Sequence, residues 1–295
     1  MLLPAFSFPA FAQMYPNEKR KLKRFREYLR YRYSVATHYK QCKKFEAFLN
    51  QHPLWIPLFQ HYPYRVNTLL STYCDRQWNA SQRLQAVMNN LMVIQQKFGV
   101  DCCQRLLNEG HMVLATLTED LILRLNINLV DPLEGLFSIN LQDRQTQQSV
   151  YDASFTFLSE NQLLIASIQG PKGEQAQEQV RHVTKELHGM RPMFMLVYCF
   201  RLFAQQFHCA LLGIPHRKQA KYRWNDSRRL LFDYDAFWQE NEGDLHDGYW
   251  HIPTQIERKP LEDIQSKKRS MYRKRYEMFD GLSESIKACF CHGSK

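Results

Sequence analysis

The chain has 295 residues, of which 44% are hydrophobic and 23% are charged, so it can bury one large core or two modest ones. This composition excludes an intrinsically disordered protein. The formal net charge of +10 lies at the two ends, because residues 1–50 hold 11 Lys or Arg against 3 Asp or Glu and residues 267–295 hold 8 against 3. Such ends suggest an anionic partner, either a membrane surface or nucleic acid, although a solvated charged surface explains them equally well.

The N-terminal segment MLLPAFSFPAFAQ is not expected to be a secretory signal, because it lacks a basic start and Pro4 and Pro9 interrupt it. Arg201 and two glutamines interrupt the apolar stretch at 193–207, so no transmembrane helix is expected. The eight cysteines include no C-x-x-C pair, which favours reduced thiols and no metal site. We therefore expect a cytoplasmic protein.

Residues 18–33, EKRKLKRFREYLRYRY, predict a basic amphipathic helix. Leu22, Phe25, Leu29 and Tyr33 recur at helical intervals, and eight Lys or Arg with two Glu fill other positions. Such a helix can lie on anionic lipid, bind a partner or nucleic acid, or pack on the core with a solvated outer face. Packing on the core is our leading interpretation.

Helical patterns dominate from residue 37 to 125, with the clearest segments at 81–98 and 102–117. After residue 120 the pattern changes to alternating apolar residues separated by turn-forming residues, which predicts antiparallel strands. The expected strands lie at 121–129, 135–141, 153–158 and 163–168. The expected later elements are helices at 174–188 and 193–207, a strand at 209–214, a short helix at 234–241, an extended segment at 248–253 and a basic helix within 261–279.

These elements predict an α+β fold, in which a helical N-terminal region precedes an antiparallel or mixed sheet with helices. We divide the chain into a mainly helical region at 1–120, an α+β domain at 121–260, and a basic C-terminal helix and tail at 261–295. In the tail, Ile264, Met271, Tyr272 and Tyr276 fall at helical spacing, so a packed helix with basic flanks accounts for it. Nucleic acid is therefore a minor alternative as a partner.

Residues 169–173, QGPKG, form a loop between the last of the four expected strands and the next helix. A helix N-terminus offers free N–H groups and glycines let an anion approach the backbone, so this loop can bind pyrophosphate. Pro171 removes one donor and the spacing G-x-x-x-x-G-K-[ST] is absent, so a plain turn is the commoner explanation of the loop alone. The candidate cofactor-binding residues are Gln169, Gly170, Lys172 and Gly173.

The order of elements over residues 130–255 resembles the Gcn5-related acetyltransferase fold. In that family the loop after the corresponding strand receives the pyrophosphate of acyl-coenzyme A, so the resemblance implies this cofactor. The loop of that family usually reads Arg/Gln-x-x-Gly-x-Gly/Ala, which QGPKG matches loosely. Two consecutive helices also follow the loop here, where the simplest member of the fold has one.

Acyl transfer would need a proton shuttle near the acceptor and a donor for the thioester oxyanion. Polar positions of the helix after the loop supply His182, Lys185 and His188 as candidates, and the segment around Trp238 supplies Asp233, Tyr234, Asp235 and Glu240. Ordinary surface positions explain the first three equally well, and an acidic helix start explains Asp233 and Asp235.

Four longer segments, LLIASIQG, VTKELHGMRP, FDYDAFWQENEG and SKKRSMYRKRY, resemble the VirK/YbjX family of Gram-negative bacteria. The matching residues are Gln169, Gly170, Thr184, Lys185, His188, Gly189, Arg191, Pro192, Asp233, Tyr234, Phe237, Trp238, Lys268, Arg269, Tyr272, Arg275 and Tyr276. The resemblance implies a role in virulence and in resistance to host cationic antimicrobial peptides, but no known reaction. Structural roles would also explain the matches, with Gly189 and Pro192 ending a helix and Phe237 and Trp238 in the core.

Two hypotheses follow for the function. In the first, an envelope-defence protein transfers an acyl group from acyl-coenzyme A to an envelope precursor. In the second, the protein is a non-enzymatic factor that binds a membrane surface or another protein through its basic ends. Either would place the protein in the cytoplasm, free or peripheral on the inner membrane.

Overall fold

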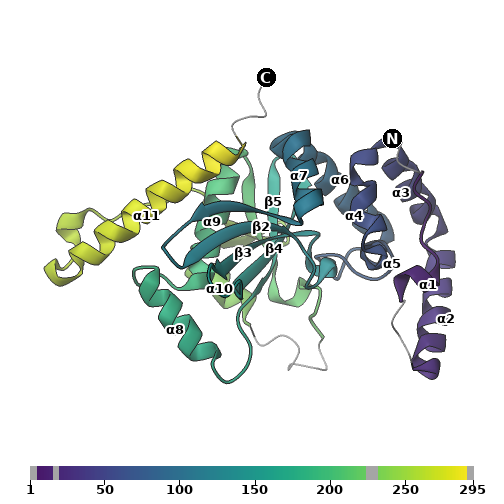
Figure 1. The fold of residues 1–295 in the computed structure, drawn as a ribbon, viewed down its shortest axis with the longest axis horizontal. Coiled ribbons are helices and arrows are strands. Elements are labelled where there is room, and N and C mark those ends of the chain that lie inside the picture. The colour runs from purple at the N-terminus through teal and green to yellow at the C-terminus, as the bar shows by residue number, and fades with distance from the viewer. Residues whose placement is uncertain (1–4, 16–19, 224–231, 291–295) are drawn as a thin grey trace.

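The computed structural model describes residues 5–15, 20–223 and 232–290, in which helices surround an eight-stranded sheet (Figure 1). The strands are β1 (His111–Thr116), β2 (Leu121–Ile127), β3 (Phe137–Asp143), β4 (Ser149–Ser159), β5 (Gln162–Gln169), β6 (Ala210–Gly213), β7 (Asp244–His246) and β8 (Tyr249–Ile252). The helices before the sheet are α1 (Phe11–Met14), α2 (Lys21–Thr37), α3 (Tyr39–Gln51), α4 (Ile56–Gln60), α5 (Asn67–Leu70), α6 (Ala80–Phe98) and α7 (Val100–Glu109). The later helices are α8 (Ala176–Glu186), α9 (Pro192–Gln206), α10 (Tyr234–Glu240) and α11 (Ser266–Phe290).

The strands lie in the order β1-β2-β3-β4-β5-β6-β8-β7. Each neighbouring pair is antiparallel except β5 and β6, which are parallel because α8 and α9 connect them. The α+β prediction with a mixed sheet is therefore confirmed. The division at residue 121 stays a prediction, although β1 precedes that residue and pairs with β2 beyond it.

An aromatic cluster in the core joins elements from both ends of the chain. Phe98 of α6 lies 6.4 Å from Phe157 of β4 and 4.7 Å from Phe290 of α11, measured between ring centroids. Phe203 of α9 lies 5.5 Å from Phe290. Such pairs add about 0.5–1.5 kcal/mol each beyond the area they bury. The last helix is therefore part of the main core.

The helix expected at 102–117 is wrong in its second half. α7 ends at Glu109, Gly110 has a left-handed φ of +75°, and the chain continues as β1. A glycine with positive φ is the common end of a helix because it has no Cβ to clash. Strand β7 was missed altogether, because its three residues are all exposed and show no alternation.

The expectation that the apolar stripe of the front helix packs on the core is also wrong. In α2 the stripe is exposed, with 88% of Leu22, 61% of Phe25, 50% of Leu29 and 74% of Tyr33 accessible to solvent. The opposite side of the helix packs instead, through the buried Tyr31, whose hydroxyl donates a hydrogen bond to the Pro9 carbonyl. Periodicity locates an apolar face but does not say what covers it. Residues 18 and 19 of the expected helix lie outside the described residues.

Candidate functional site

The parallel strands β5 and β6 stop pairing before β5 reaches the glycine loop. Their pairing runs from Gln162 opposite Ala210 to Ile165 opposite Gly213, and β5 then continues to Gln169. The Ile214 N–H still donates to the Ile165 carbonyl, at 3.1 Å. The wedge beyond this bond is the kind of place where open α/β sheets bind ligands.

Two side chains of α10 fill this wedge. The Tyr234 hydroxyl accepts a hydrogen bond from the Ile168 N–H at 3.0 Å and donates to the Ile168 carbonyl at 3.3 Å. The Trp238 indole N–H donates to the Ile214 carbonyl at 2.8 Å. Both side chains are almost completely buried, which confirms Trp238 as a core residue. Burial, with a contribution from the Glu134 charge, raises the pKa of Tyr234, so its hydroxyl stays protonated.

The other acidic residues predicted around Trp238 have structural partners. Asp233 caps α10 by accepting a hydrogen bond from the Ala236 N–H at 3.1 Å. Asp235 accepts from the Trp250 indole at 2.8 Å and from the His216 N–H at 3.0 Å. The two contacts of Asp235 hold α10 in place beside the wedge.

The glycine loop is split between a covered half and an exposed half. Gly170 lies against the ring of Tyr151, so closely that a Cβ there would come within 2.6 Å of the ring. Lys172 and Gly173 are exposed, and Gly173 has a φ of +100°. A surface hollow of about 450 Å³ opens beside them, lined by Tyr151, Pro171, Ala176, Gln177, Val180 and Arg181.

The three candidates on or after α8 do not join the Tyr234 site. His182 pairs with Glu186 at 3.0 Å on the exposed side of α8, and Lys185 is also exposed. His188 has a left-handed φ of +52°, and its carbonyl accepts a hydrogen bond from the Arg275 Nε at 3.0 Å. Burial, Lys274 and Arg275 lower the pKa of His188.

Two of the motif segments meet between α8 and α11. Besides the bond from Arg275 to His188, a Cβ on Gly189 would lie 2.9 Å from the Arg275 guanidinium and 3.2 Å from the Met271 sulfur. The N–H of Gly189, whose φ is +80°, donates to the Thr184 carbonyl at 2.8 Å, which closes the end of α8. Glu240, in the third segment, pairs with the exposed Arg191 at 3.1 Å. These motif residues therefore have structural contacts.

A buried carboxylate that the sequence did not reveal lies next to the loop. Glu134 accepts hydrogen bonds from the amides of Gln169 and of Gln219, the latter at 2.6 Å, and its other partner is Lys221 at 3.3 Å. Burial raises the pKa of Glu134, and Lys221 partly offsets that effect. The motif P-L-E-G around Glu134 looks like an ordinary turn, so only the fold shows that this carboxylate reaches the end of β5.

The comparisons with known proteins agree with the motif resemblance. A family model described as a protein of unknown function, DUF535, matches residues 20–288. An uncharacterized protein of Haemophilus influenzae is 53% identical over 95% of this chain and 97% of its own length. The membrane protein LapB of Mannheimia haemolytica is 36% identical over 73% and 94%, and the uncharacterized protein YbjX of Escherichia coli is 26% identical over 80% and 78%. No solved structure matches significantly.

Proposed function

The chain belongs to the DUF535 family, which includes YbjX, and we propose that it is an envelope-defence protein that works on an anionic membrane surface and docks there through α2. The observation that carries this proposal is the exposed apolar stripe of Leu22, Phe25, Leu29 and Tyr33. The relative LapB is named a membrane protein, which lends further support. Among the described residues, no helix has the length and apolar content needed to cross a bilayer. The association that we propose is peripheral, because it uses one exposed apolar face of α2.

The charges of α2 are placed for this contact. At 3.6 residues per turn, Arg26 and Arg30 lie along one edge of the stripe, and Lys21 and Arg32 lie along the other. Basic residues beside a membrane-inserted apolar face attract anionic headgroups, by about 1 kcal/mol for each residue near the surface. The opposite face of α2 packs on the protein through Tyr31, so the stripe can reach lipid without unfolding.

The two basic ends of the chain do not share one location. Figure 1 shows α2 and the first turns of α11 at opposite ends of the longest axis of the molecule. The exposed large hydrophobic side chains of the described residues include four in α2 besides Tyr28, and none in α11. We therefore assign membrane docking to α2 and leave α11 as a charged, packed helix.

Co-sedimentation with vesicles of phosphatidylglycerol and phosphatidylethanolamine, beside pure phosphatidylcholine vesicles, tests the proposal. We expect binding to the anionic vesicles alone, weakened by salt and lost in a variant that carries Leu22→Gln, Phe25→Gln and Leu29→Gln. The matched control neutralises three lysines of α11, with Lys267→Gln, Lys268→Gln and Lys274→Gln, and should retain binding. Retained binding in the α2 variant, with loss in the α11 variant, would show that net charge and not the apolar stripe drives the association, and would contradict the role of α2.

The envelope-defence part needs a cellular experiment. A strain that lacks the protein should survive a cationic antimicrobial peptide less well, and the wild-type gene should restore survival. The triple α2 variant should fail to restore it at equal protein level. Full restoration by that variant would separate envelope defence from membrane docking.

A second candidate function is acyl transfer from acyl-coenzyme A. Support comes from the parallel pair β5 and β6, the wedge where their pairing ends, and the loop of Gln169–Gly173 at the mouth of this wedge. The bond between the acyl carbon and the coenzyme A sulfur would break as a bond to a nucleophilic atom of the envelope precursor forms, a base would take the proton of that atom, and coenzyme A would leave as the thiolate. Glu134 is better placed for that role than His182, Lys185 or His188, because it contacts Gln169 and burial raises its pKa.

Calorimetric titration with acetyl-, lauroyl- and palmitoyl-coenzyme A tests this candidate. We expect Lys172→Glu to weaken binding about tenfold or more by placing a negative charge at the pyrophosphate, whereas Lys287→Glu, on α11, should have no effect. Substitution of Gly170 would be uninformative, because any side chain there clashes with Tyr151. Absence of binding to all three thioesters would eliminate the enzyme hypothesis.

A further inference from the structure

A two-residue turn brings together three potential metal ligands at the far edge of the sheet. Asp247 and Gly248, with φ values of +51° and +81°, connect β7 to β8. Positive φ at both positions is typical of the type I′ turns that favour Asp-Gly in hairpins. The pairing places His246 opposite Tyr249 and Asp244 opposite His251, so the two histidines lie on the same face of the hairpin.

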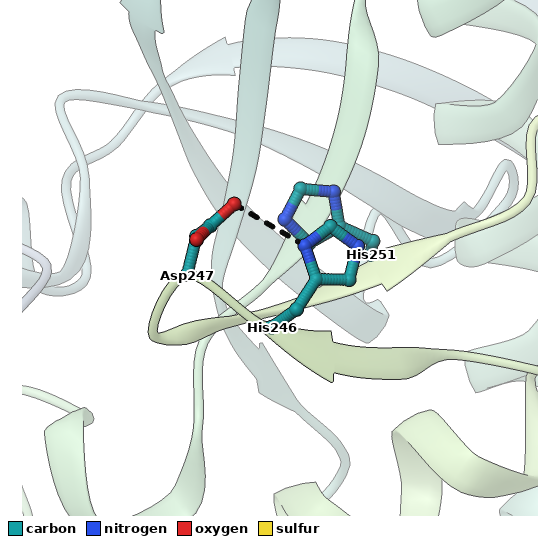
Figure 2. A group of neighbouring side chains, drawn as sticks. All are labelled: His246, Asp247 and His251. Atoms are coloured by element: carbon teal, nitrogen blue, oxygen red, sulfur yellow. Dashed lines mark hydrogen bonds and ion pairs between the residues drawn. The ribbon is translucent and has the colours of Figure 1, made fainter.

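Figure 2 shows the two imidazole rings face to face, with the Asp247 carboxylate beside His246. The ring centroids are 3.4 Å apart at an interplanar angle of 19°, and Asp247 Oδ2 lies 3.4 Å from His246 Nδ1. One ligand atom from each of His246, Asp247 and His251 can be chosen so that all three lie within 4.8 Å of one another.

The distances between these ligand atoms are close to the distances between the ligand atoms of a bound metal ion. Ligand atoms about 2.0–2.1 Å from a tetrahedral ion are roughly 3.3 Å apart, so the three atoms need to converge by about 1.5 Å or less. An imidazole nitrogen binds a metal in the plane of its ring, so the two stacked rings also have to turn before they point to one ion. His246 and Asp247 are exposed and His251 is partly exposed, so rotation about their side-chain bonds can supply both movements without disturbing the core.

We propose that His246, Asp247 and His251 bind one divalent transition-metal ion of the Zn²⁺ class. Two imidazoles with one carboxylate favour Zn²⁺, Ni²⁺, Co²⁺ or Cu²⁺ over Mg²⁺ and Ca²⁺, which prefer oxygen ligands alone. Water fills the remaining coordination positions, because the hairpin is open to solvent. No metal site is expected from the sequence, because only the pairing of β7 with β8 brings these histidines together.

The ion would fasten the edge of the sheet. The Tyr249 hydroxyl of β8 donates to the buried Asp75 at 2.8 Å, and Trp250 donates to Asp235, so β8 is already tied to the body of the protein. β7 is the terminal strand and its three residues are exposed. A metal bound by His246 and His251 cross-links β7 to β8. The terminal strand β7 would then be held to the rest of the protein through β8.

The test uses the full chain with Zn²⁺ in calorimetry and Co²⁺ in absorption spectroscopy. We expect one ion per chain, and a loss of affinity of at least about tenfold in each of His246→Asn, Asp247→Asn and His251→Asn, since even second-shell changes cost 10–100-fold. The control His61→Asn removes an exposed histidine elsewhere and should bind normally. Asn is tolerated at the positive φ of residue 247, so Asp247→Asn preserves the turn.

Cysteine thiols could bind Zn²⁺ in place of the two histidines, and a variant can distinguish the two kinds of ligand. A Cys289→Ser/Cys291→Ser variant should bind Zn²⁺ with unchanged affinity, and the Co²⁺ spectrum should lack thiolate charge transfer. Amide hydrogen exchange at residues 244–246 should slow on addition of Zn²⁺ in the wild type and not in His251→Asn. Absence of stoichiometric binding, or binding that survives His251→Asn, would overturn the proposal.

Discussion

The hydroxyl of Tyr234 makes two hydrogen bonds to the backbone of Ile168, accepting from its N–H and donating to its carbonyl. Ile168 lies three residues beyond the last residue of β5 that pairs with β6. The tyrosine therefore takes the place of a neighbouring strand for the part of β5 that does not pair with β6, and its side chain closes the wedge. A ligand that enters the wedge has to exchange its own hydrogen bonds for those of Tyr234.

We predict that Tyr234→Phe lowers the free energy of unfolding by about 1–3 kcal/mol. The ring would stay in place, but two buried backbone groups of Ile168 would lose their partner. Urea denaturation followed by circular dichroism measures the change. Tyr39→Phe, at a side chain that is 57% exposed, is the control and should change stability by less than about 0.5 kcal/mol. Equal stability of the two variants would mean that the wedge does not depend on these bonds.

Gly213 should be essential for the packing of Trp238 in the same wedge. A Cβ at Gly213 would lie 2.5 Å from the indole ring, so Gly213→Ala should destabilise the protein by about 1–3 kcal/mol through overpacking. Gly281 of α11 is the matched control, because a Cβ there meets no atom within 4 Å. Gly281→Ala should stabilise the helix by up to about 1 kcal/mol. Thermal melting of both variants should therefore move the transition in opposite directions.

The stability of the protein should fall as the pH rises from about 4 to about 6, in part because of Asp152. Burial raises the pKa of Asp152 to about 6, although Ser138 and Asn140 donate hydrogen bonds to it. In this window the folded chain holds a proton on Asp152 that the unfolded chain has released, so the contribution of this proton to stability is complete below the window and lost above it. Asp152 is partly exposed, so we expect its contribution to the free energy of unfolding to fall by about 1–2 kcal/mol across this window.

Denaturation curves between pH 3.5 and about pH 7 would measure this slope for the wild type and for Asp152→Asn. The variant keeps an oxygen that can accept the bond from Ser138 but cannot titrate. Its slope should be smaller than that of the wild type across the same window. Parallel curves would show that other carboxyl groups cause the pH dependence.

The sequence predicted the elements whose signals are local. The strands at 121–129 and 163–168 and the helices at 174–188 and 193–207 were located to within a few residues, because apolar periodicity and turn residues mark them. The sequence predicts a helix where β1 lies, although the helix ends at Gly110, and β7 has no buried residue to produce a pattern. Local signals thus identified the inner strands of the sheet but not its two edge strands, β1 and β7.

The candidate site was less predictable, because its contacts connect segments far apart in the chain. Tyr234 was among the candidates, but its partner Ile168 was not. Glu134 meets Gln169 and Gln219 from 35 and 85 residues away, and no spacing in the sequence encodes such a meeting. The role of the loop residues in cofactor binding stays a prediction. The contact of Gly170 with Tyr151 depends on the pairing of β4 with β5, which the local sequence does not encode.

The two faces of α2 should respond differently to substitution. Leu22→Gln with Phe25→Gln should change the free energy of unfolding by less than about 0.5 kcal/mol for each residue, because both side chains are exposed. Tyr31→Ala should cost about 3–5 kcal/mol, since it empties a buried site beneath the helix and removes the bond to Pro9. Chemical denaturation without lipid measures both changes.

The same variants separate folding from membrane binding when vesicles are added. Anionic vesicles should raise the melting temperature of the wild type, because a ligand that binds the folded state stabilises it. They should leave the variant with Leu22→Gln and Phe25→Gln nearly unchanged, although that variant is as stable as the wild type in buffer. If these substitutions instead destabilise the isolated protein as strongly as Tyr31→Ala does, the stripe is packed in solution, and α2 is not free to meet a membrane.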